Sequence, residues 1–234
     1  MPPAKRAKRG AAAPAPLELR YFPVMAKGLG CAIVCEYSGL PWMGSKELGF
    51  LARGGPPGKN FADIKASLPF GQLPLLTTAE GEMVAQTTAI INFVGKTAGI
   101  EGDGRDYAVS QMLIAEAEDL YALTNKCVPT IVAPLNQGIK GDKAQYDTFW
   151  NEKLPPHLAY LEKLCAAGAG FHETPGSLYL FSILHQLALV KPGLLKGGKL
   201  GKWYAATLAD RRTVKVLAGE SSIGELKQYF IAEP

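Results

Sequence analysis

The spacing of apolar and polar residues divides the chain into a first part that contains strands and a second part that is helical. Leu17, Leu19 and Tyr21 alternate with polar residues, which is the period of a half-buried strand. Apolar repeats of helical period follow, separated by glycine- and proline-rich turns. The elements expected in the first part are a strand at 17–21, a helix at 29–39, an ambiguous segment at 42–50, a loop at 53–58, a helix at 60–68, strands at 73–77 and 82–85, and a helix at 86–98.

After Gly104 the apolar residues recur only at helical spacing. Helices are expected at 107–126, 144–166, 177–190 and 200–217. The third of these is apolar almost all round, which predicts a central buried helix, and Thr174 and Pro175 suit its N-cap and first position. The pattern therefore predicts a small α/β domain over residues 17–101, followed by an all-α domain over 102–234.

Length and composition fit two compact domains, because 234 residues with 47% hydrophobic content can bury a substantial core. The formal charge of +4 comes from the first 16 residues, a basic Ala/Pro-rich tail that we expect to be disordered. Without the four basic residues of that tail, the 25 lysines and arginines fall to 21, equal to the 21 acidic residues. Net charge thus gives no support for nucleic-acid binding by the body. The tail is a nuclear signal, an organellar targeting remnant, or a solvated arm without a specific role.

The spacing of the cysteines and the hydropathy of the chain bear on metal binding, on the state of the thiols and on the cellular location. The four cysteines lie far apart with no Cys-x-x-Cys pair, and the three histidines are scattered, so we expect reduced thiols and no metal. No apolar run has the length of a membrane span, and the N-terminus has no secretory hydrophobic region. A cytoplasmic location is the resulting expectation, with nuclear or organellar targeting by the tail left open.

A proline within an apolar strand is the most specific feature of the first part. Pro74 follows Leu73, and proline is tolerated in a sheet only at edges, first positions or bulges. A cis bond at Pro74 would present the backbone amide and carbonyl of Leu73 to an extended peptide. Gln86 and Thr87 then open a helix, whose first amides attract a carboxylate. The segment therefore predicts a site for a peptide-sized anion.

Several motifs together resemble the soluble, cytosolic-type glutathione transferases, and among them the sigma and pi classes. These are Tyr21-Phe-Pro-Val, Lys65-Ala-Ser, Gly71-Gln72-Leu73-Pro74, Gln86-Thr87-Thr-Ala-Ile and Glu118-Asp119-Leu120. The resemblance runs from about Leu17 to the last helices. It implies a thioredoxin-like N-terminal domain that binds glutathione as a co-substrate, and an all-helical C-terminal domain that contributes a hydrophobic substrate site.

The resemblance also implies roles for individual residues. Tyr21 would be the catalytic residue and would donate a hydrogen bond to the glutathione sulfur, with Lys27 near the reaction centre. The other glutathione-binding residues implied are Phe61, Lys65, Gln72, Leu73, Pro74, Gln86, Thr87 and the Asp119 of a partner subunit. Phe70 would insert into that partner, which implies a homodimer.

Two departures from the family pattern bear on the activity. Phe61 stands where the sigma pattern has tryptophan, so an indole donor is lost, and Lys27 stands where an arginine is common. The predicted function is conjugation of thiolate glutathione to an electrophilic, largely apolar substrate, or its isomerisation or reduction. A detoxification role would follow. The alternative is a non-catalytic ligand carrier or structural subunit of the same fold. Met25, Tyr121 and Leu123 are possible contacts of the apolar substrate.

Overall fold

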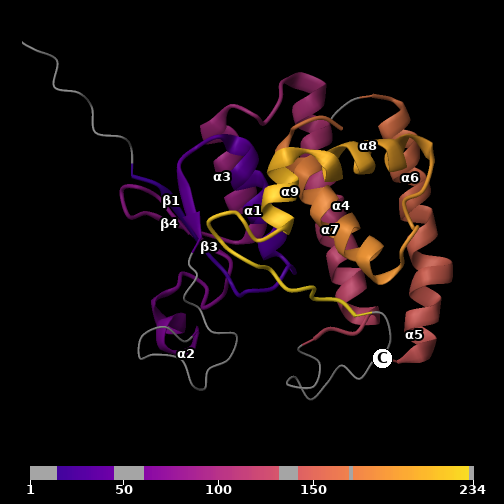
Figure 1. Ribbon diagram of the computed structural model, residues 1–234, viewed down its shortest axis with the longest axis horizontal. Helices are drawn as coiled ribbons and strands as arrows, with labels where there is room; N and C mark the ends of the chain where they lie inside the picture. Colours follow the sequence, from indigo (N-terminus) through magenta and orange to yellow (C-terminus); the bar gives the residue numbers. More distant parts are fainter. Residues whose placement is uncertain (1–14, 45–60, 132–141, 169–170, 232–234) are drawn as a thin grey trace, which may run out of the picture.

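A computed structural model describes residues 15–44, 61–131, 142–168 and 171–231 (Figure 1). Most of the basic tail and the loop expected at 53–58 lie outside these residues. The strands are β1 (Leu17–Arg20), β2 (Trp42–Gly44), β3 (Leu75–Thr77) and β4 (Met83–Ala85). The helices are α1 (Gly28–Ser38), α2 (Phe61–Ile64), α3 (Thr87–Ala98), α4 (Gly104–Cys127), α5 (Lys143–Thr148), α6 (Leu154–Ala166), α7 (Pro175–Val190), α8 (Gly198–Ala209) and α9 (Arg211–Leu217), with 3-10 turn η1 (Lys65–Ser67) and π-helical stretch η2 (Phe149–Lys153).

The four strands form one mixed sheet in the order β2-β1-β3-β4. β1 runs parallel to β2 and antiparallel to β3, and β3 pairs antiparallel with β4. Leu19 lies opposite Leu76, and both side chains are fully buried beneath the helices. The alternation seen in the sequence thus sets the inward face of β1, and the α/β-then-helical fold class is confirmed.

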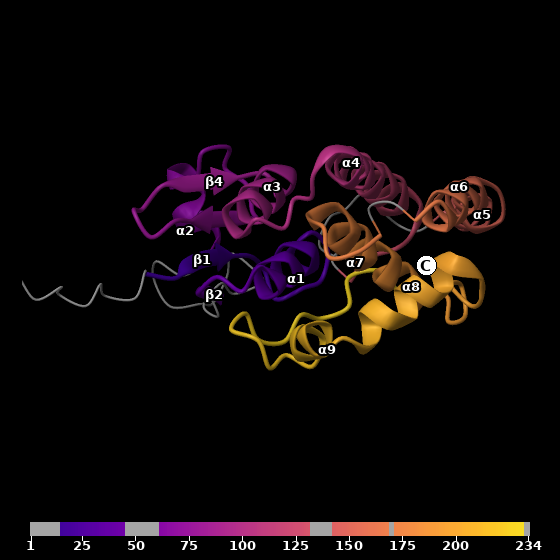
Figure 2. The same ribbon diagram turned by 90° about the horizontal axis from the view of Figure 1, so that it is seen from above.

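Successive layers of helices extend away from the sheet (Figure 2). α1 and α3 lie next to the strands, α4 and α7 follow, and α5, α6 and α8 are farthest from the sheet. α7 forms the centre, because almost its whole surface is buried, as its apolar sequence predicts. Gly176 at its start allows the close approach of α4, since a Cβ there would lie 1.9 Å from the Ser110 carbonyl oxygen.

The start of α7 follows its sequence signals. Thr174 caps α7 by accepting the Ser177 N–H, and Pro175 occupies the first helical position.

The prediction of a single helix at 200–217 is wrong, because two helices, α8 and α9, lie there. The backbone is extended at Asp210, with ψ 135°, and its carboxylate accepts the Arg212 N–H at 2.8 Å, so a new helix begins. The apolar residues keep a helical period across this break, so the sequence pattern did not predict it.

Candidate functional site

Tyr21 lies directly after β1 and is held at the N-terminal end of α1. Its hydroxyl oxygen accepts the backbone N–H of Lys27 at 3.3 Å, which leaves the phenolic O–H free to donate elsewhere. The ring packs on Gly28, where a Cβ would lie 2.1 Å from the Tyr21 Cδ1, so only glycine admits this arrangement. Burial of the side chain, which is 8% exposed, raises the pKa of Tyr21 above its usual value. The phenol is therefore a neutral donor at physiological pH.

Lys27 is held by an acidic partner from the helical part of the chain. Its Nζ lies 2.5 Å from the Glu118 Oε2 and 5.2 Å from the centroid of the Tyr121 ring. The other oxygen of Glu118 accepts the hydroxyl of Tyr179 on α7 at 2.5 Å. The three side chains thus link α1, α4 and α7 beside Tyr21. Tyr179 was missed in the sequence, although a phenol within an all-apolar helix signals a need for a buried hydrogen-bond partner.

Phe61 and Lys65 lie together on the far side of Phe22. The Phe61 and Phe22 rings meet edge to face at 5.3 Å, and Phe22 in turn contacts the Tyr21 ring at 5.6 Å. The Lys65 Nζ lies 6.0 Å from the centroid of Phe61 and the lysine side chain is exposed. This row of aromatic rings connects the segment around Lys65 to Tyr21.

The segment around the proline meets the start of α3. The Leu73–Pro74 peptide bond is cis. Gln86 donates from its Nε2 to the Oε1 of Gln72 at 3.3 Å, so these two predicted residues come together. Gln86 is exposed and adopts φ 75°, a conformation that non-glycine residues seldom adopt, whereas Thr87 is buried at 3% exposure.

Asp119 is separated from this group within the chain. It is exposed on α4, next along the helix from Glu118, which points inward to Lys27. The described residues thus bring Tyr21 near Lys27, Phe61 near Lys65, and Gln72 near Gln86, while Asp119 faces away.

The C-terminal segment lies against the residues that follow Tyr21, a contact that the sequence did not reveal. The Met25 N–H donates to the Lys227 carbonyl at 2.8 Å, and the Lys227 N–H donates at 3.1 Å to the carbonyl of Pro23, two residues after Tyr21. Phe230 lies on the Tyr121 ring with 5.8 Å between centroids. Met25 is buried, whereas Tyr121 and Leu123 are only partly buried. The sequence of this segment has neither a helical nor a strand period, so no pattern predicted its position.

The cysteines of α1 do not supply chemistry here. Cys31 and Cys35 are buried and free, and burial raises the pKa of both thiols, to about 12 for Cys35. A protonated, enclosed thiol is a poor nucleophile. Within the described ranges, no group of three or more His, Cys, Asp or Glu side chains is arranged to hold a metal, and no helix is both long and apolar enough to cross a membrane.

A four-stranded mixed sheet with a cis-proline strand, joined to a helical bundle, defines the class: a thioredoxin-like domain extended by helices. No protein-family model matches the chain. Glutathione S-transferase 1 of Ascaris suum is 32% identical over 154 residues, which are 64% of this chain and 66% of the relative, just under two thirds of its length.

Solved structures of the same fold span nearly the whole chain. The sigma-class glutathione transferase of Fasciola hepatica superposes with a TM-score of 0.63 at 21% identity, over 86% of this chain and 95% of its own. The pi-class enzyme of Onchocerca volvulus superposes with a TM-score of 0.66 at 19% identity, over 88% of this chain and 93% of its own. The chain is thus similar in sequence to a glutathione S-transferase, and it has the fold of the solved glutathione transferases.

Proposed function

We propose that this protein is a glutathione transferase that binds glutathione beside Tyr21 and transfers its sulfur to an electrophilic, largely apolar substrate. The observation that carries the proposal is the hydroxyl of Tyr21, which is neutral, oriented by the Lys27 N–H and located where the first strand meets the first helix. The similarity to glutathione S-transferase 1 of Ascaris suum supports glutathione as the co-substrate.

The chemistry requires the thiol to be ionised before attack. A free thiol has a pKa near 8.5, so only a few per cent is thiolate at neutral pH. Lowering that pKa by about two units requires roughly 2.7 kcal/mol of preferential stabilisation of the anion. A donor hydrogen bond from Tyr21 provides part of this, and the Lys27 ammonium adds positive charge, partly offset by Glu118. The thiolate sulfur then attacks the electrophilic carbon, and the leaving group departs with its electron pair.

The rest of glutathione would occupy the groups around the proline. In this arrangement the backbone of Leu73 pairs with the cysteinyl unit, and Gln86 and Thr87 receive the γ-glutamyl carboxylate at the start of α3. Lys65 and Gln72, beside Phe61, would meet the glycyl carboxylate. The closeness of Gln72 to Gln86 supports a single site that contains both.

A homodimer would complete the site through the Asp119 of the partner subunit. The exposed apolar residues Phe70, Met83 and Met112, which are 64%, 50% and 56% exposed, support an interface on this side. The elements β4 and α4 lie along the same side of the molecule (Figure 2). Analytical ultracentrifugation of the wild type, of Phe70→Ser and of the matched control Tyr160→Ser tests this assembly. A monomeric wild type would remove Asp119 from the proposed site.

The test of function combines binding and turnover. We expect retention of the wild type on glutathione resin and conjugation of glutathione to an aryl halide. Tyr21→Phe should retain binding, because the hydroxyl meets only the sulfur, yet should lose about a hundredfold in kcat, the usual effect of removing one donor to a developing anion. Binding without turnover in the wild type would favour the ligand-carrier alternative. Absence of binding would overturn the site.

A further inference from the structure

A recess of about 250 Å³ lies on the helical part of the chain, remote from Tyr21. It opens where the end of α1, the segment before α7, the face of α8 and the turn into α9 meet. Tyr37 lines it near the end of α1, ten residues after Lys27, which directly precedes that helix, so the two residues lie about 15 Å apart along the helix axis. The volume is below the roughly 300–1,000 Å³ of drug-sized sites, so it suits a small molecule.

One wall of the recess is aromatic and apolar. The rings of Phe171 and Trp203 meet at 88° with 5.1 Å between centroids, and Leu178 lies beside them on α7. Trp203 is only partly buried and is among the residues that line the recess. An aromatic wall of this kind binds planar rings and attracts cations over its ring faces.

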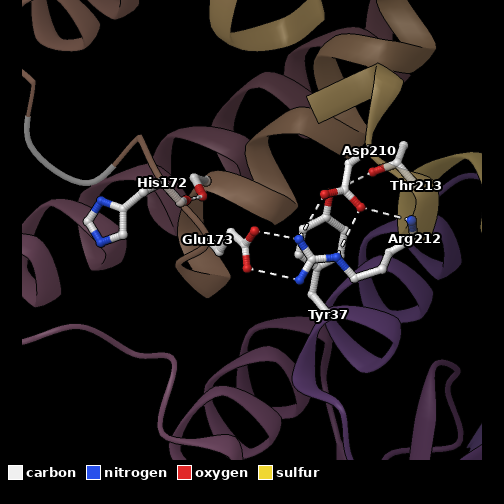
Figure 3. A network of polar contacts seen from close by, with 7 residues as sticks. Tyr37, His172, Glu173, Asp210, Arg212 and Thr213 are labelled. Carbon is white, nitrogen blue, oxygen red and sulfur yellow. Dashed lines mark hydrogen bonds and ion pairs between the residues drawn. The ribbon is translucent and has the colours of Figure 1, made fainter. Parts of the chain in front are cut away.

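The recess is also lined by two acidic residues, Glu173 and Asp210. Figure 3 shows the Arg212 guanidinium between them, over the Tyr37 ring at 3.8 Å. The nitrogens Nε, Nη1 and Nη2 of Arg212 all donate to these two carboxylates. The hydrogen bonds from Arg212 hold the pKa of Asp210 at about 2, so its carboxylate is ionised at neutral pH.

This arrangement selects the charge of a ligand. The guanidinium is engaged by two carboxylates and does not line the recess, whereas both carboxylates do and retain unused lone pairs. No lysine or arginine is among the described residues that line it. His172 also lines it, on the far side of Glu173 from Arg212 and 3.9 Å from the Asp106 carboxylate (Figure 3). Apart from His172, the charged side chains of the described lining are therefore acidic, and they disfavour an anion.

We propose that this recess binds a small aromatic amine in its protonated form, with the planar ring against Trp203 and Phe171 and the ammonium at Glu173 and Asp210. The floor is pre-formed, because Tyr37 is hydrogen-bonded to Thr213 at 2.9 Å and Arg212 joins the carboxylates from two different segments. A site of this kind is independent of the glutathione chemistry and remains testable in a protein that turns over no substrate.

The test follows the indole N–H signals of the full-length protein by ¹⁵N–¹H NMR during titration with tryptamine. The chain has three tryptophans, and Trp203→Phe assigns the signal of the recess. Two further probes have the same ring without the positive charge: neutral indole and anionic indole-3-propionate. We expect tryptamine to shift the Trp203 signal saturably and to bind at least about tenfold tighter than indole-3-propionate.

Two variants separate the proposal from non-specific binding. Glu173→Gln retains the shape of the side chain and should weaken tryptamine about five- to tenfold, whereas Glu80→Gln, in the exposed β3–β4 turn, should leave its affinity unchanged. Melting curves verify that both variants fold. The proposal is overturned if the Trp203 signal does not move with tryptamine, if all three probes bind equally, or if Glu173→Gln and Glu80→Gln bind alike.

Discussion

His185 makes the stability of the fold depend on pH between about 4 and 6.5. The side chain lies on α7 with 7% exposure, stacks on Phe181 at 5.6 Å and contacts the Tyr204 hydroxyl through its Nδ1 at 2.9 Å. Burial lowers the pKa of His185 from 6.5 to about 4. The unfolded chain therefore binds a proton over a range of pH in which the folded chain does not.

The sign and size of the effect follow from this difference in proton binding. Stability is retained above the unfolded pKa of 6.5 and is lost as the pH falls toward 4, because protonation then favours the unfolded state. With these two values, the free energy of unfolding should fall by about 2 kcal/mol from pH 7.5 to pH 5 through His185 alone.

The measurement compares His185→Phe with the wild type. Urea unfolding followed by circular dichroism at pH 5, 6 and 7.5, at one protein concentration, gives the free energy of unfolding of each. Between pH 7.5 and pH 5, the free energy of unfolding of His185→Phe should fall by about 2 kcal/mol less than that of the wild type. Tyr204→Phe is the control, since it removes only the hydroxyl partner and should keep the wild-type slope if burial is the cause. Parallel pH profiles for wild type and His185→Phe would refute the reasoning.

Three further substitutions test contacts at the site and elsewhere. Gly28→Ala places a Cβ into the Tyr21 ring, so kcat/KM for aryl-halide conjugation should fall tenfold or more, with a lower melting temperature; an unchanged kcat/KM would contradict this packing. Tyr179→Phe removes the donor that orients Glu118, and the apparent pKa of conjugation should rise without loss of glutathione binding; an unaltered pH profile would exclude a positioning role. Glu162→Gln weakens the carboxylate that accepts the first amides of α8, so the melting temperature at neutral pH should fall, and an equal or higher value would count against this cap.

Local patterns predicted the parts of the site that depend on residues near one another in the chain. Tyr21 and Lys27 are six residues apart, and the strand-then-helix order alone brings them together. The Glu118–Tyr179 hydrogen bond joins residues 61 positions apart, and only the packing of α4 against α7 creates it. Sequence periodicity describes the face of one helix, and it carries no information on which other helix that face meets.

The same limit explains why the sequence did not predict the position of the C-terminal segment or the break at Asp210. No apolar period in the sequence marks the bridge between Lys227 and Val24 or the extended backbone at Asp210. Asp210 did carry a signal, because aspartate is a frequent N-cap, but the apolar repeat on both sides of it favoured a continuous helix. The predicted roles of Asp119, Gln86 and Lys65 remain predictions that depend on a bound ligand and a second subunit.

α1 is enclosed on all sides, and this has a consequence for how the chain can be divided. Nearly all of its residues are buried, by α3 on one side and by α7 and α9 on the others. The predicted boundary near residues 101–104 divides the sequence into a part with strands and a helical part, but the packing of α1 against α7 and α9 joins the two parts. A fragment ending there would expose the apolar surface of α1 that α7 and α9 cover. Neither part is a self-sufficient module, so a recombination or truncation at this point would yield aggregating pieces rather than a smaller working protein.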